Sequence, residues 1–317
     1  VKNYTPLSLT PELEIEPRDY QREALSSWKE NQRRGTVVLP TGSGKTYLGV
    51  QAIVDSEVTT LVVVPTIDLM NQWYSTLKNA FGEQVEIGVL GGGEHDIKPI
   101  TVSTYDSGYL YIDSYGDRFG LLVFDEVHHC AAPTHQHIPE MSIAPYRLGL
   151  TATYERADQK HLQLRDLIGE KVYEEKPEGL TGEYLSEYET IRMKVELTDE
   201  ERQKYDEEYS IYRDYIDSED LELWKDEGYQ EFLKRTAKDT RARRALIAKN
   251  RSESIARTAE KKLDTLDTLI KRHHDDRVII FTANNEFAYE ISREFIIPCI
   301  THQTETDERT EILDRFK

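Results

Sequence analysis

Between residue 18 and about residue 175, short apolar runs alternate with stretches whose apolar residues recur at helical spacing. Runs such as TTLVVVP and LLVF read as strands that are buried on both faces. Strands of this kind belong to parallel sheets with helices on each side. The alternation therefore predicts an α/β fold built on a parallel sheet.

The 317 residues are enough for two or three domains. Their longest apolar runs are far shorter than a membrane span, and the N-terminal residues show no secretory signal. Two cysteines, Cys130 and Cys299, build no disulfide framework. We therefore expect a reduced, cytoplasmic protein, associated with the nucleoid if archaeal, with no membrane partner.

The net charge of -19 is unevenly distributed along the chain. Residues 174–232 hold 21 Asp/Glu against 7 Lys/Arg, whereas residues 233–262 hold 11 Lys/Arg against 3 Asp/Glu. The basic segment, which includes Arg241, Arg243 and Arg244, indicates contact with a polyanion, and its alternative interpretation is a solvated helix face. The acidic total therefore does not exclude a nucleic-acid partner.

The stretch LPTGSGKT, residues 39–46, lies between a predicted strand and a predicted helix. Leu39 replaces the first glycine of the general P-loop pattern, but the remaining turn keeps the groups that bind phosphate. Glycines let backbone N–H groups point inward, Lys45 reaches the β- and γ-phosphates, and Thr46 coordinates Mg²⁺. The residues predicted to bind ATP in this turn are Thr41, Gly42, Ser43, Gly44, Lys45 and Thr46. A fortuitous glycine turn is the alternative.

The stretch LLVFDEVHHCAAPTHQH, residues 121–137, holds an acid pair and four of the nine histidines. Asp125 and Glu126 follow a predicted buried strand, and ligands of open α/β sheets bind at the carboxyl ends of strands. We assign Mg²⁺ coordination to Asp125 and activation of the attacking water to Glu126, with Lys45 as the third catalytic residue. The less favoured alternative is a zinc site made by His128, His129, Cys130, His135 and His137.

Together these motifs resemble those of superfamily 2 helicases, and more closely the archaeal XPB helicases of that group. RDYQ (18–21) is similar to the segment that contacts adenine, which assigns Arg18 and Gln21 to ATP binding. The other motifs follow in the family's order: LPTGSGKT as motif I, VVVPTIDLMNQW (62–73) as Ia, TVSTYDS (101–107) as Ib, FDEVHH (124–129) as II, LGLTAT (148–153) as III and VIIFT (278–282) as IV.

The resemblance implies further roles for individual residues. It implies that His128, Thr151 and Thr153 couple ATP hydrolysis to domain closure. An Arg-Glu-Asp element linked to strand separation follows motif III in the family, and here it reads Arg156-Ala157-Asp158, with alanine in place of glutamate. The residues assigned to DNA binding are Pro65, Thr66, Thr104, Arg156, Asp158, Thr282, Arg241, Arg243 and Arg244.

We expect three parts: a RecA-like ATP-binding motor domain at 1–177, a helical thumb-like insert at 178–262, and the start of a second RecA-like domain at 263–317. In the insert, Thr198 and Glu201 predict a capping box. The stripe of Tyr205, Tyr209, Tyr212 and Ile216 predicts a helix packing face, and stacking of the tyrosines on bases is the alternative. Strands are predicted at 277–282 and 296–302. Motifs V and VI do not occur, so we expect part of a longer chain that is itself deficient in hydrolysis.

The sequence thus predicts the DNA-dependent ATPase motor of an XPB-like helicase or translocase, which uses ATP and Mg²⁺ to open forked or duplex DNA in repair or transcription. The resemblance also implies a nuclease partner in archaea. Two alternatives stay open: an RNA helicase or remodeller-like translocase on the same core, and, for these residues alone, a non-catalytic nucleotide-binding scaffold.

Overall fold

The structure is a computed structural model that describes residues 3–12, 16–154, 162–180, 182, 189–221 and 226–316. The chain divides into two compact units, Val1–Glu189 and Thr190–Lys317, whereas the sequence predicted its first boundary after residue 177. In this described part of the chain, no helix combines the length and apolar character that crossing a membrane requires.

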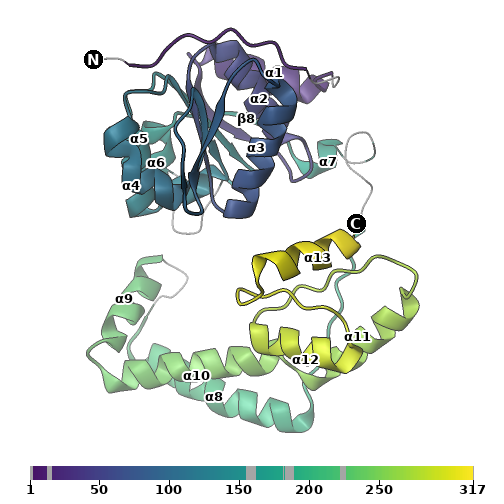
Figure 1. Ribbon diagram of the computed structural model, residues 1–317. Coiled ribbons are helices and arrows are strands. Elements are labelled where there is room, and N and C mark those ends of the chain that lie inside the picture. The colour runs from purple at the N-terminus through teal and green to yellow at the C-terminus, as the bar shows by residue number, and fades with distance from the viewer. Residues whose placement is uncertain are drawn as a thin grey trace. The chain divides into compact units, whose positions relative to one another are not determined.

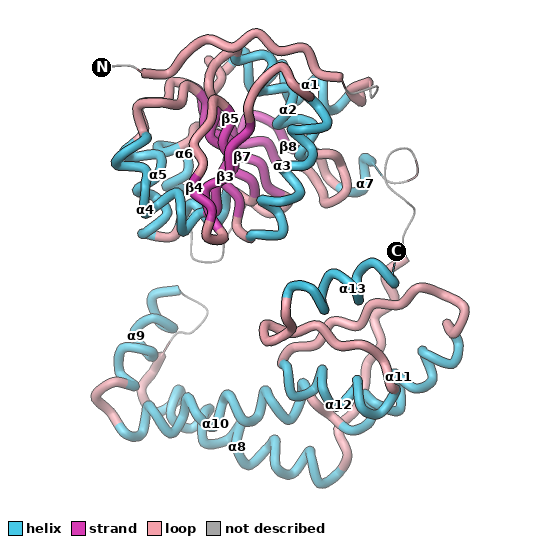
Figure 2. Tube along the Cα trace, in the orientation of Figure 1, coloured by secondary structure: helices cyan, strands magenta, loops and turns pink. Residues whose placement is uncertain are grey.

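The first unit is built on an eight-stranded sheet with the order β4-β3-β5-β2-β6-β7-β1-β8. Figure 2 draws its strands in magenta. All neighbouring strands pair in parallel except β3 and β4, which are antiparallel. The strands are β1 (Arg34–Val38), β2 (Thr60–Val64), β3 (Ile87–Gly91), β4 (Glu94–His95), β5 (Ile100–Thr104), β6 (Leu121–Asp125), β7 (Tyr146–Thr151) and β8 (Lys171–Glu174). The predicted parallel α/β fold is confirmed.

Helices cover both faces of this sheet (Figure 1). One face carries α1 (Asp19–Glu30), α2 (Lys45–Ser56) and α3 (Ile67–Phe81); the other carries α4 (Tyr105–Tyr115), α5 (Pro133–Met141) and α6 (Leu162–Leu167). The short η1 (Val127–Ala131) follows β6, and α7 (Pro177–Leu180) follows β8. Along β2, Val62 and Val64 enter the core under α1–α3, while Leu61 and Val63 enter the core under α4–α6. A strand buried on both faces explains the continuous apolar run in the sequence.

The second unit is helical in its described residues. Its helices are α8 (Asp199–Ser218), α9 (Asp226–Thr236), α10 (Thr240–Arg257), α11 (Glu260–Arg272), α12 (Asn285–Phe295) and α13 (Thr306–Phe316). The predicted capping box at the start of α8 is confirmed, because Thr198 Oγ1 accepts from Glu201 N (3.3 Å) and Glu201 Oε2 accepts from Thr198 N (2.8 Å). α8 and α10 lie side by side (Figure 1).

The predicted tyrosine packing face of α8 is used at one end only. Tyr212 and Ile216 pack against the small core formed by Tyr215, Phe232, Ala242 and Ala245. Tyr209 stays 38% exposed and stacks on Tyr205, with ring centroids 5.5 Å apart. The sequence therefore predicted the packing role correctly for the C-terminal half of the stripe.

The strands predicted at 277–282 and 296–302 are wrong, because no strand forms in the second unit's described residues. Each of these two segments is followed by a helix, α12 after the first and α13 after the second. Val278, Ile279 and Phe281 are 43%, 57% and 90% exposed, so this apolar run is not covered as a parallel strand must be. Without paired neighbours on each side, a short apolar segment gains too little to hold strand geometry. The RecA-like character of this unit stays a prediction.

Candidate nucleotide-binding site

The residues predicted to act on nucleotide gather at one edge of the first unit's sheet. β1 ends at the 39–46 loop, β6 ends at Asp125 and β7 ends at Thr151. β2 and β5 end at the same edge, β2 at Val64 just before Pro65 and Thr66, and β5 at Thr104. Because parallel strands bring their carboxyl ends to the same edge, one edge of the sheet collects motifs that are far apart in the sequence.

The phosphate loop has the backbone that its sequence predicts. Gly42 and Gly44 both have a φ of 80°, a conformation that glycine adopts without steric cost. Gly44 is the N-cap of α2, so the unpaired N–H groups of that helix point into the loop. Lys45 Nζ donates to the carbonyl oxygens of Leu39 and Pro40, both at 3.3 Å. The ammonium group is therefore held above the loop, where phosphate oxygens would replace those carbonyls.

The start of α1 is bonded to the same loop. Gln21 is 4% exposed; its Nε2 donates to the Ser43 carbonyl (2.8 Å), while its Oε1 accepts from Arg18 N (3.0 Å). The Tyr20 hydroxyl donates to the same Ser43 carbonyl at 2.7 Å. A Cβ added at Gly44 would lie 2.6 Å from Gln21 Nε2, and the φ of 80° would strain any other residue at this position. Arg18 and Gln21 thus lie beside the P-loop, and their contact with adenine stays a prediction.

Asp125 is the most enclosed carboxylate of the site, with 6% of its surface exposed. Its Oδ2 accepts a hydrogen bond from Trp73 Nε1 (2.8 Å), and its Oδ1 accepts one from the backbone N–H of Glu126 (3.0 Å). Burial raises the pKa of the Asp125 carboxyl; the charge of Glu126 adds to this effect, whereas the Trp73 bond and the charge of Lys45 oppose it. A cation at this position would offset the cost of burying the charge.

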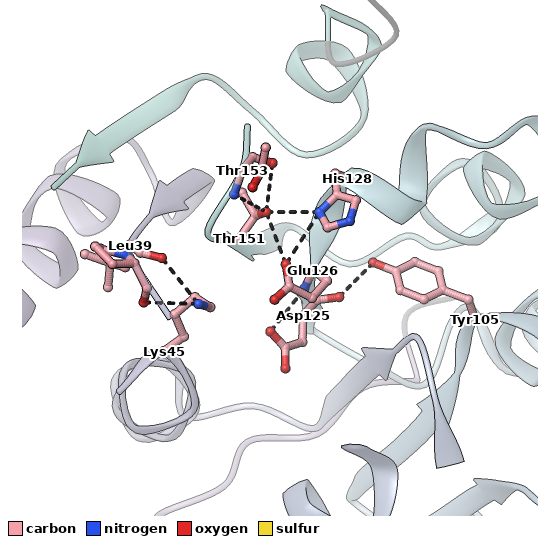
Figure 3. A network of polar contacts seen from close by, with 9 residues as sticks. Leu39, Lys45, Tyr105, Asp125, Glu126, His128, Thr151 and Thr153 are labelled. Atoms are coloured by element: carbon pink, nitrogen blue, oxygen red, sulfur yellow. Dashed lines mark hydrogen bonds and ion pairs between the residues drawn. The ribbon is translucent and has the colours of Figure 1, made fainter. Parts of the chain in front are cut away.

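Glu126 is held in an unusual backbone conformation, with φ 47° and ψ 55°. This left-handed geometry costs a non-glycine residue on the order of 1–3 kcal/mol. The Glu126 carboxylate lies 3.3 Å from Thr151 Oγ1 and 3.5 Å from His128 Nδ1. Thr151 Oγ1 also lies 3.1 Å from His128 Nδ1 and 2.9 Å from the Thr153 carbonyl (Figure 3). The three predicted coupling residues therefore form one network with Glu126.

The donor set of this edge fits Mg²⁺ rather than zinc. Thr46 and Asp125 offer hard oxygen ligands, and Mg²⁺ binds through one or two protein oxygens together with water and substrate phosphates. Two histidines of the alternative zinc site have other contacts: His137 pairs with Asp113 (2.9 Å), and the His135 ring packs against Tyr105. Among the residues that the structure describes, no group of three or more His, Cys, Asp or Glu side chains could hold a metal ion.

The segments assigned to DNA in the first unit are helix N-termini. Thr66 Oγ1 caps α3 by accepting from Leu69 N (3.2 Å), and Thr104 Oγ1 caps α4 by accepting from Ser107 N (3.2 Å). Helix N-termini present free N–H groups and a positive dipole, both of which suit phosphate. The geometry is compatible with the predicted contacts, and Pro65 precedes the first of these caps.

The other residues assigned to DNA lie elsewhere. Arg156 and Asp158 fall outside the described residues. In the second unit, Thr282 Oγ1 donates to the Asn284 carbonyl (2.9 Å), and Arg243 Nε donates to the Thr236 carbonyl (3.3 Å). Arg241 Nη1 lies 3.8 Å from Glu219, while Arg244 is exposed.

Three aromatic residues of the site were not predicted from the sequence: Tyr20, Trp73 and Tyr105. Each occupies an apolar position of an amphipathic helix, so its place in the sequence is that of an ordinary core residue. Tyr105 donates its hydroxyl to the Asp125 carbonyl at 3.2 Å. Nothing in one sequence distinguishes a buried ring with a polar task from a buried ring without one.

Several known proteins are similar to this chain in sequence. The sequence model of a family described as "Type III restriction enzyme, res subunit" matches residues 14–156. The DNA 3'-5' translocase XPB2 of Sulfurisphaera tokodaii is 40% identical over 303 residues, covering 96% of this chain and 68% of the relative. The XPB2 subunit of the general transcription and DNA repair factor IIH of Arabidopsis thaliana is 26% identical over 344 residues, covering 98% of this chain and 39% of the relative.

One solved structure shares the fold along most of the chain. The helicase domain of Hef from Pyrococcus furiosus aligns with a TM-score of 0.50 at 16% identity, covering 95% of this chain and 83% of that domain. At an identity this low, the similarity indicates a shared fold and does not indicate the substrate.

Proposed function

Because this chain belongs to the XPB family of DNA helicases and translocases, we propose that it is the ATPase motor of such an enzyme. Its task is to couple ATP hydrolysis to the opening of forked or duplex DNA in repair or transcription. The observation that carries this proposal is the convergence of Lys45, Asp125 and Glu126 at one edge of the sheet, with a coupling network attached to Glu126.

The phosphate end of ATP is bound by the 39–46 loop. Lys45 exchanges the Leu39 and Pro40 carbonyls for β- and γ-phosphate oxygens, which offer it full negative charges. Thr46 and Asp125 hold Mg²⁺, which when bound neutralises charge developing on the phosphates. Arg18 and Gln21, already bonded to the loop, lie on the side from which the adenine is contacted.

Glu126 orients and deprotonates the attacking water. The strained backbone of Glu126 and the contacts of its carboxylate with Thr151 and His128 fix the position of that carboxylate. A movement of either neighbour therefore changes the orientation of the carboxylate toward the water. Thr151 also contacts the Thr153 backbone at the end of motif III. Hydrolysis is thereby coupled to the chain segment that follows β7.

DNA is bound through its phosphates. The α3 and α4 N-termini at Thr66 and Thr104 supply N–H groups, and α10 supplies positive charge from Arg243 and Arg244. Further contacts are assigned to Pro65, Arg156, Asp158, Arg241 and Thr282. A nuclease partner is proposed on the family resemblance alone, and co-purification with a DNA-cleaving activity tests it.

The test is ATP hydrolysis with and without forked DNA, by wild type and Lys45→Ala. The 317 residues contain no Gly-Arg dipeptide and hence no motif VI, whose arginines can contribute ~10³–10⁵ in rate. The assay therefore includes a version to which a segment carrying that motif is joined. We expect DNA-stimulated hydrolysis by the version with motif VI, loss with Lys45→Ala, and slow hydrolysis by the 317 residues alone. Stronger stimulation by RNA would favour an RNA helicase, and hydrolysis unaffected by Lys45→Ala would refute the motor.

A further inference from the structure

Asp125 is held from two sides by buried aromatic donors that come from different helices. Trp73 of α3 is 0% exposed, and its indole N–H donates to Asp125 Oδ2 at 2.8 Å. Tyr105 of α4 is 2% exposed, and its hydroxyl donates to the Asp125 backbone carbonyl at 3.2 Å (Figure 3). One bond fixes the carboxylate, and the other fixes the backbone that carries it.

Both donors lie close to a segment assigned to DNA. Tyr105 directly follows Thr104, the cap of α4. Trp73 lies about two helical turns after Thr66, the cap of α3. An α-helix transmits displacement along its axis because its hydrogen bonds keep the rise per residue fixed. A shift at either cap on binding a phosphate therefore reaches Asp125 through a single side chain.

The Trp73 ring also packs against α2, the helix that follows the phosphate loop. A Cβ added at Gly49 of α2 would clash with the Trp73 ring, so α2 and α3 meet directly at this glycine. Indole has one N–H and no acceptor, so the bond to Asp125 is the only hydrogen bond that the Trp73 side chain can make. Loss of this bond would leave the buried indole N–H without its acceptor and the buried Asp125 Oδ2 without this donor.

We propose that Trp73 and Tyr105 are positioning residues that transmit DNA binding at the α3 and α4 N-termini to the Mg²⁺ ligand Asp125. The proposal rests on the proposed function, because it explains how DNA stimulates that same site. Neither residue touches the reacting atoms. Trp73 fixes the rotamer of the Asp125 carboxylate, and Tyr105 fixes the position of the Asp125 backbone at the C-terminal end of β6.

Trp73→Phe and Tyr105→Phe remove these donors and keep most of each ring. The matched control is Trp28→Phe, because Trp28 is equally buried and donates its indole N–H to the Arg147 carbonyl at 2.9 Å, away from the site. We expect Trp73→Phe and Tyr105→Phe to lower the DNA stimulation of hydrolysis about 10-fold and to raise the Mg²⁺ concentration needed for half-maximal rate. DNA affinity without nucleotide should stay within about two-fold of wild type. Trp28→Phe should keep both the stimulation and the Mg²⁺ dependence.

A second readout needs no hydrolysis. In ¹⁵N-tryptophan-labelled protein, Trp73→Phe identifies the Trp73 indole resonance, which should move when DNA is added without nucleotide or Mg²⁺. The movement should be smaller in Tyr105→Phe, and the Trp28 resonance should stay in place. A Trp73 resonance indifferent to DNA, or variants with the stimulation and Mg²⁺ dependence of wild type, would overturn this inference alone. A version that carries motif VI but shows no DNA-stimulated hydrolysis would overturn the proposed function and the inference with it.

Discussion

Thr151 joins motif III to the acid pair, because its Oγ1 lies 3.3 Å from the Glu126 carboxylate and 3.1 Å from His128 Nδ1. Thr151 is fully buried at the end of β7, and Glu126 follows the neighbouring strand β6. One hydroxyl thus links Glu126, the carboxylate proposed to activate water, to His128 and Thr153, the other two residues predicted to couple hydrolysis to domain closure. The sheet supplies this closeness, since the two residues are far apart in the sequence.

Thr151→Val keeps the shape of the side chain and removes this hydroxyl. We expect kcat for DNA-stimulated hydrolysis to fall about 10- to 100-fold with little change in the KM for ATP, because Glu126 loses its positioning partner and the phosphate loop is untouched. The matched control is Thr36→Val on β1, where the buried hydroxyl has no hydrogen-bond partner in the described part of the chain. That change should keep kcat and raise the unfolding free energy by about 1 kcal/mol. An unaltered kcat in Thr151→Val would remove Thr151 from the mechanism.

The pKa of Asp125 makes a prediction about stability and pH. Burial raises this pKa above its usual range, so the folded protein binds the proton at a higher pH than the unfolded chain does. The protonated Asp125 carboxyl therefore contributes most to the unfolding free energy at low pH. This contribution is lost as the pH rises through the pKa of the folded state, and the unfolding free energy falls by at most about 1.4 kcal/mol per pH unit. Asp125→Asn cannot ionise and lacks this loss.

The measurement is the difference in Tm between Asp125→Asn and wild type from pH 4 to pH 8, in EDTA and without nucleotide. The difference should move in favour of the asparagine variant as the pH rises. Only its slope is used, because asparagine also loses one of the two bonds from Trp73 and Glu126 at every pH. A flat difference would mean that the carboxylate is ionised at no cost in the folded protein.

Local signals in the sequence were sufficient where neighbouring residues decide the structure. Local residues set both ends of α3, because Thr66 caps its start and Gly82 ends it. The 39–46 loop was predicted from its glycines, which need no distant partner to adopt a positive φ. The acid pair was placed at a strand end because the apolar run before it is unambiguous.

Long-range pairing could not be predicted in the same way. β8 was missed because KVYE is short and half-polar, and it is a strand only by pairing with β1. The opposite error occurred at 277–282, where an apolar run without paired neighbours is no strand. Trp73 shows the same limit in the site, since its bond to Asp125 joins residues of two elements that the sequence separates.

The carboxylate of Glu201 satisfies the backbone N–H groups of two helix starts. It accepts from Thr198 N at 2.8 Å and from Glu260 N at 2.8 Å, so it joins the N-termini of α8 and α11. Glu201→Ala should lower the unfolding free energy by about 1–2 kcal/mol, since two N–H groups lose their acceptor. Glu200→Ala, an exposed change one residue earlier, should stay within about 0.5 kcal/mol of wild type. Denaturant unfolding of both variants and wild type measures these differences. Equal unfolding midpoints for Glu201→Ala and wild type would show that water replaces the Glu201 carboxylate as the acceptor.

The arginines of α10 should differ in their contribution to DNA binding. Arg251 Nη1 pairs with Glu208 of α8 at 3.1 Å, so part of its charge is already compensated. Arg244 is exposed on the same helix. If α10 contacts phosphates, Arg244→Ala should weaken DNA binding and reduce the slope of log K against log salt by about 1. Arg251→Ala, the matched control, should change that slope by much less. Fluorescence anisotropy with labelled forked DNA over a salt series measures both slopes, and equal slopes for wild type and Arg244→Ala would exclude Arg244 from the interface.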